Sequence, residues 1–113
     1  MEPVLVRRRP PRRIHPHEDA LVILDLPTGL TQLFKSPIRG RSVRLPAVSP
    51  DGRHVIFQVD RHGVWLLDLK GGSMRCVLTD PTADGFAWTA DGRRFAFHSR
   101  RSGEWEMWVM APS

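Results

Sequence analysis

The chain has 113 residues, of which 41% are hydrophobic and 26% are charged, the composition of an ordinary small globular domain. Its one cysteine, Cys76, excludes an intramolecular disulfide framework. No apolar run approaches the roughly 20 residues that span a bilayer. Because no apolar segment follows the first basic residues either, we expect a cytoplasmic protein without a secretory signal or membrane contact.

The positive charge gathers at the N-terminus, where residues 1–17 hold five arginines and one glutamate of a chain with a net charge of +5. These arginines are Arg7, Arg8, Arg9, Arg12 and Arg13. Like charges and interspersed prolines disfavour regular structure, so we interpret residues 1–19 as a disordered basic tail, with a short strand over 4–6 as the alternative. Such a tail offers electrostatic contact to nucleic acid or to an acidic partner.

Two further groups of polar residues are candidates for binding. His15 and His17 precede Glu18 and Asp19, but no other ligand stands at metal-site spacing, so we interpret this segment as solvated and expect no metal. A second basic cluster lies in a predicted loop and comprises Lys35, Arg39, Arg41 and Arg44.

From residue 20 onward the chain reads as short strands separated by Gly, Pro and Asp. Two strands are predicted first, over 21–26 and 30–34. Four follow, over 45–48, 54–59, 64–69 and 74–78, and then three more, over 86–88, 94–98 and 105–110. Apolar residues occupy both faces of the central strands, which is typical of a sheet covered on both sides.

A motif between strands recurs after forty residues. Ser49-Pro50-Asp51-Gly52-Arg53 returns as Thr89-Ala90-Asp91-Gly92-Arg93, and Arg61-His62-Gly63 returns as Arg101-Ser102-Gly103. Ser, Pro and Gly stand where a type I turn prefers them, so we interpret the aspartates as turn residues rather than a catalytic pair. The predicted structural motif therefore comprises Ser49, Pro50, Asp51, Gly52, Asp91 and Gly92. A period of about 40 with only strands inside it indicates propeller blades.

The segment from Ser49 to Gly72, with the returns at 88–92 and 107–110, resembles the WD40-like repeat of TolB-type β-propellers. The resemblance implies four-stranded antiparallel blades with binding as their default use. We therefore predict an all-β chain of about two and a half blades. A half blade is expected at about 20–35, a full blade at about 45–79 and an incomplete blade at about 85–111.

No motif predicts catalysis. The sequence has no Gly-x-Ser-x-Gly nucleophile elbow and no phosphate-binding glycine loop, and no histidine neighbours Cys76 in sequence. We predict a non-enzymatic module without a cofactor that binds a protein or peptide. Three copies could close into a ring if strand 30–34 of one copy completed the blade of 86–110 in the next. The alternative is a fragment of a larger TolB-like or prolyl-oligopeptidase-like propeller.

Overall fold

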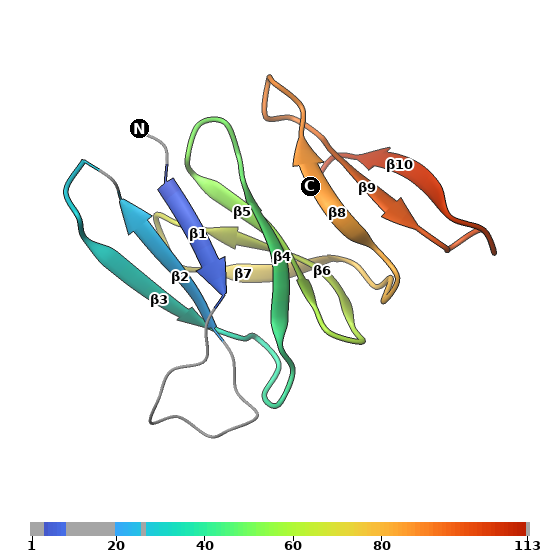
Figure 1. Cartoon of the computed structure of the whole chain (residues 1–113), viewed down its shortest axis with the longest axis horizontal. Helices are drawn as coiled ribbons and strands as arrows, with labels where there is room; N and C mark the ends of the chain where they lie inside the picture. The colour runs from blue at the N-terminus through green and yellow to red at the C-terminus, as the bar shows by residue number, and fades with distance from the viewer. Residues whose placement is uncertain (1–3, 9–19, 26, 113) are drawn as a thin grey trace.

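The described part of the chain folds into three antiparallel sheets that stand side by side like the blades of a fan (Figure 1). The structure is a computed structural model that describes residues 4–8, 20–25 and 27–112, and this part of the chain contains no helix. Its strands are β1 (Val4–Arg8), β2 (Ala20–Asp25), β3 (Thr31–Lys35), β4 (Val43–Val48), β5 (His54–Val59), β6 (Gly63–Asp68), β7 (Met74–Leu78), β8 (Asp84–Trp88), β9 (Phe95–Ser99) and β10 (Glu106–Met110). The predicted all-β architecture of propeller blades is confirmed.

The middle sheet is the complete blade, with strand order β4-β5-β6-β7. Its second strand, β5, is buried at five of its six positions, because its two faces meet different neighbours. Val55, Phe57 and Val59 belong to a core cluster shared with the N-terminal sheet, whereas Ile56 belongs to a cluster shared with the C-terminal sheet. Each core thus lies between sheets and not within one, as expected when blades cannot bury their faces alone.

The N-terminal sheet differs from the prediction because it has three strands, in the order β1-β2-β3. Val4 to Arg8 pair with Asp25 to Leu21, so part of the segment interpreted as a disordered tail is a strand. The prediction of disorder for 9–19 falls outside the described residues.

The C-terminal sheet has three strands, β8, β9 and β10, and its last connection also differs from the prediction. Phe57 pairs with Trp65 in the middle sheet, and Phe97 pairs with Trp108 in the C-terminal sheet. Equivalent residues are therefore 40 positions apart between β5 and β9 but 43 positions apart between β6 and β10. The difference arises because the connection 100–105 is longer than the connection 60–62. Gly103 is consequently not the structural equivalent of Gly63. Glu106 occupies that position in the C-terminal sheet.

Both inner strands carry the same irregularity. The register of β4 against β5 shifts between Arg44 and Ala47, and that of β8 against β9 shifts forty residues later, between Asp84 and Ala87. Leu45 has a φ of 56° at this bulge, and its counterpart Gly85 has a φ of 65°. The blade fold thus requires a left-handed residue here, which glycine adopts freely and leucine only with strain.

Candidate binding surfaces

The two copies of the predicted turn motif have the same hydrogen bonds. Ser49 Oγ donates to Asp51 Oδ1 over 2.6 Å, and the backbone N–H of Arg53 donates to the same oxygen over 3.0 Å. In the second copy Thr89 Oγ1 lies 2.6 Å from Asp91 Oδ1, which also accepts the N–H of Arg93 over 3.0 Å. One oxygen of each aspartate therefore takes part in the hydrogen bonds of the turn.

These bonds also fix the charge of the turn. The Ser49 hydroxyl and the Arg53 N–H lower the pKa of Asp51 below its ordinary value, and a hydroxyl and an N–H do the same for the pKa of Asp91. Hydrogen bonding to the ionised form is the common cause. At neutral pH each turn presents a carboxylate at the same end of its blade.

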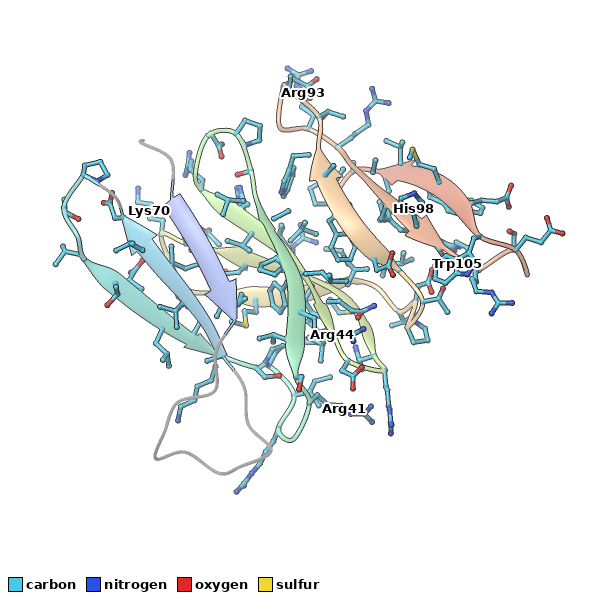
Figure 2. The ribbon with its side chains drawn as sticks, viewed as in Figure 1. Arg41, Arg44, Lys70, Arg93, His98 and Trp105 are labelled. Atoms are coloured by element: carbon cyan, nitrogen blue, oxygen red, sulfur yellow. The ribbon has the colours of Figure 1, made fainter. Side chains whose placement is uncertain are left out.

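A cleft of about 730 Å³ lies between the N-terminal sheet and the middle blade. The N-terminal sheet and the segment before β3 contribute Ile23, Asp25, Leu30, Thr31 and Gln32, and the middle blade contributes Asp51, Arg53, Leu69 and Lys70. Figure 2 shows Lys70 beside the N-terminal sheet. Apolar side chains and charges of both signs thus line one opening, of the size that ligand pockets have in proteins.

Three of the four charged side chains that line the cleft are available to a ligand. Within the described part of the chain, the side chains of Asp25, Arg53 and Lys70 form no hydrogen bond or ion pair. The repeat mate of Arg53 is Arg93, which follows the same turn but does not line the cleft; Figure 2 shows it at the connection between β8 and β9. Arg53 is a candidate binding residue because its turn borders the cleft. The turn motif alone does not make it one, since Arg93 follows the same motif.

Each of the two terminal sheets has an outer face, on the side opposite to the residues that pack against the middle blade. The C-terminal outer face comprises Ala96, His98, Met107 and Val109, and the N-terminal outer face comprises Val22, Leu24, Thr31 and Leu33. Met107 is 66% exposed, Val109 53% and Leu33 49%. Exposed apolar side chains grouped on one sheet face are typical of an interaction surface.

The predicted basic cluster is divided between structural and exposed roles. Arg44 donates from Nε and Nη2 to Oε1 of the buried Gln58, over 3.2 and 2.7 Å, and Arg41 Nη1 donates to the Asp60 carbonyl over 3.3 Å. Figure 2 shows both arginines near the start of β4. Lys35 and Arg39 instead line a small depression of about 210 Å³.

Several predicted candidates cannot be placed. Arg9, Arg12 and Arg13, and the cluster of His15, His17, Glu18 and Asp19, lie outside the described residues. Arg7 and Arg8 belong to β1 by their backbone alone. Among the residues that are described, no three His, Cys, Asp or Glu side chains gather as metal ligands, and no helix is long and apolar enough to cross a membrane.

A buried polar network that the sequence did not reveal joins the middle blade to the C-terminal sheet. Asp80 accepts hydrogen bonds from Ser99 Oγ and from both the N–H and the hydroxyl of Thr82, the latter two over 2.9 and 2.7 Å. Burial opposes the ionisation of Asp80, but these bonds outweigh it and lower the pKa of the carboxyl. The signal available in the sequence was only an Asp-Pro-Thr connection, which predicts a turn.

Comparison with solved structures agrees with this architecture. The β-propeller domain of the Trilobed protease from Pyrococcus furiosus, described as having an open velcro topology, superposes on 96% of this chain with a TM-score of 0.73 and 18% identity. Acylaminoacyl peptidase from Pyrococcus horikoshii matches 73% of the chain at 26% identity with a TM-score of 0.60, and the tricorn protease matches 82% at 20% identity with a TM-score of 0.64. The fold is therefore that of a partial β-propeller.

The chain is short relative to these proteins, since it spans 36%, 13% and 10% of their respective lengths. The sequence matches no family model, and it matches none of the curated proteins.

Proposed function

We propose that this chain is a run of three propeller blades that binds a protein or peptide without catalysing a reaction itself, and that the cleft between the N-terminal sheet and the middle blade is its binding site. The observation that carries the proposal is the combination of an apolar lining with two carboxylates and two cations around one opening. A concave apolar surface with a few convergent polar groups is the usual form of a binding site.

The charges define the ligand. Arg53 and Lys70 attract carboxylates, Asp25 and Asp51 attract ammonium or guanidinium groups, and Ile23, Leu30 and Leu69 accept apolar side chains. An extended peptide that carries both signs of charge beside an apolar residue satisfies all three requirements. A purely acidic or purely basic peptide leaves one pair of charges unmatched.

Two further proposals concern the context of the module. Its likeness to parts of peptidase propellers supports a role within a longer propeller, while the exposed outer faces support completion by a second copy. The hypothesis that the arginine-rich segment binds nucleic acid or an acidic partner stays a prediction, because no described side chain belongs to that segment.

The test uses a library of random octapeptides selected against the immobilised chain. We expect the enriched peptides to pair an apolar residue with charges of both signs. Arg53→Ala is expected to lower the affinity for the selected synthetic peptide by about tenfold, since a hydrogen bond to a charged group contributes about 1.5–3 kcal/mol. Isothermal titration calorimetry measures the effect.

The repeat supplies a matched control. Arg93→Ala removes the same side chain after the same turn but outside the cleft, and it is expected to leave the affinity unchanged. Equal affinity of the wild-type chain, Arg53→Ala and Arg93→Ala for the selected peptides would show that the cleft is not the site.

A further inference from the structure

The middle blade shows what normally covers the C-terminal outer face. In the middle sheet Ile56 pairs with Leu66 and Gln58 pairs with Val64, and these four residues are between 0% and 7% exposed. Ile56, Val64 and Leu66 pack in one cluster with Phe95 and Phe97 of the next sheet. This face of a blade is therefore buried by the blade that follows it.

The same positions of the C-terminal sheet form its outer face. Ala96 pairs with Val109 where Ile56 pairs with Leu66, and His98 pairs with Met107 where Gln58 pairs with Val64. The outer face thus keeps apolar residues at three of four positions, yet Met107 and Val109 are exposed. Figure 2 shows His98 on this last sheet of the fan. The surface has the form of a blade-to-blade contact.

The N-terminal outer face has the complementary form. Val22 pairs with Leu33 at the positions that Trp65 and Cys76 occupy in the middle blade, and Leu24 pairs with Thr31 at those of Leu67 and Met74. In the middle blade Trp65, Leu67 and Met74 pack against the core shared with the preceding sheet. The N-terminal outer face is thus built to receive a preceding blade.

We propose that two copies of this chain join head to tail, with the C-terminal outer face of each copy packed on the N-terminal outer face of the other. The contact continues the two blade-to-blade contacts that exist within one chain, so it needs no new kind of packing. Each face differs from the one that it meets, so the interface is heterologous and forms a ring when it closes.

The number of sheets selects two copies. The described part of each chain forms three sheets, because β1 completes the N-terminal one. Two copies then hold six blades, within the range of about four to eight that propellers adopt, whereas three copies hold nine. Joining the faces also leaves β3 paired with β2, without the strand exchange expected from the sequence. The cleft lies within a single chain and, of the residues named for the two surfaces, shares only Thr31 with the dimer contact.

Light scattering on a sizing column, over about a hundredfold range of chain concentration, tests the proposal through mass action. We expect a species of twice the chain mass at high concentration. Val109→Glu on one face and Leu33→Lys on the other place a charge in the contact, and each variant alone is expected to be a monomer. Both residues are about half exposed, so neither change removes a core side chain.

Mixing the two variants gives the sharper readout. In a mixed dimer the two altered faces meet in one contact and the two unaltered faces meet in the other, so the dimer mass is expected to return. An interface that pairs each face with itself gives no such rescue. Leu30→Lys is the matched control, because Leu30 is exposed at the cleft and not on the N-terminal outer face, and it is expected to remain dimeric.

Three results would overturn the proposal. A wild-type chain that is a monomer at every concentration shows that these two faces do not bind each other. A mass that rises without limit shows that the contact does not close. Failure of the mixture to dimerise, when circular dichroism shows both variants folded, excludes the head-to-tail contact.

Discussion

Leu45 is the residue whose conformation agrees least with its type. It has a φ of 56° and precedes Pro46, and both features disfavour its backbone conformation. The left-handed region costs an L-residue roughly 1–2 kcal/mol, and glycine avoids this cost. The repeat confirms the requirement, because the chain has Gly85 at the same point of the C-terminal sheet.

Substitutions at this position should therefore reverse the usual ranking of alanine and glycine. We expect Leu45→Gly to be more stable than Leu45→Ala by about 1 kcal/mol in urea unfolding, because both lose the same side-chain packing and only glycine relieves the strain. Gly85→Ala should be destabilising, since its Cβ would also lie 3.2 Å from His98 Nδ1. If Leu45→Ala proved the more stable, position 45 would not be strained.

At the scale of elements, the chain at the end of β7 passes very close to the start of β6. This close approach depends on Gly63. A Cβ on Gly63 would lie 2.2 Å from the Leu78 carbonyl oxygen and 3.0 Å from the Asp80 nitrogen, both of which are backbone atoms. In the C-terminal sheet, where the described chain has no outer strand, Glu106 takes the same place. The larger residue appears where the space beside it is open.

Gly63→Ala is accordingly expected to lower the free energy of unfolding by more than about 2 kcal/mol, because the backbone of β7 must move. Glu106→Ala is expected to change it by less than about 0.5 kcal/mol, as an exposed position should. Urea denaturation of both variants measures the difference. Equal effects at the two positions would mean that the outer strand yields easily.

The elements also show how far the sequence predicts this structure. All nine strands expected after residue 20 are present within two residues of their predicted bounds, because short β-branched and aromatic runs and the Gly, Pro and Asp residues that bound them are local signals. The cleft was not predictable, since Asp25 and Arg53 line one opening only because two sheets pack against each other. The role of β1 was likewise hidden, because its pairing with β2 spans a long connection. The Asp80 network depends on Ser99, which lies 19 residues away.

At the scale of the whole molecule, stability depends on the contacts between sheets. One core joins the N-terminal sheet to the middle blade, and the other joins the middle blade to the C-terminal sheet. The second contact is reinforced by buried Gln58, whose Nε2 donates to the Ala83 carbonyl, and by Trp88, whose Nε1 donates to the Ala47 carbonyl over 2.9 Å. Loss of one contact can therefore release a terminal sheet while the rest stays folded.

Acid should release the C-terminal sheet through Asp80. Its pKa is lowered by folding from an ordinary value of 3.8, so its ionised form stabilises the native state above that value, and the stabilisation is lost as the pH falls through the lowered pKa.

Asp80→Ala should have the same consequence at neutral pH, at a cost of about 1–3 kcal/mol, because Ser99 and Thr82 lose their acceptor. Hydrogen exchange followed by mass spectrometry should then show faster exchange in β8–β10 than in β4–β7. In the control variant Asp91→Ala, which changes an exposed turn, the difference in exchange between these two sheets should be smaller. Uniform exchange across all three sheets of Asp80→Ala would show that the molecule unfolds as one unit and that the network does not hold the last blade in place.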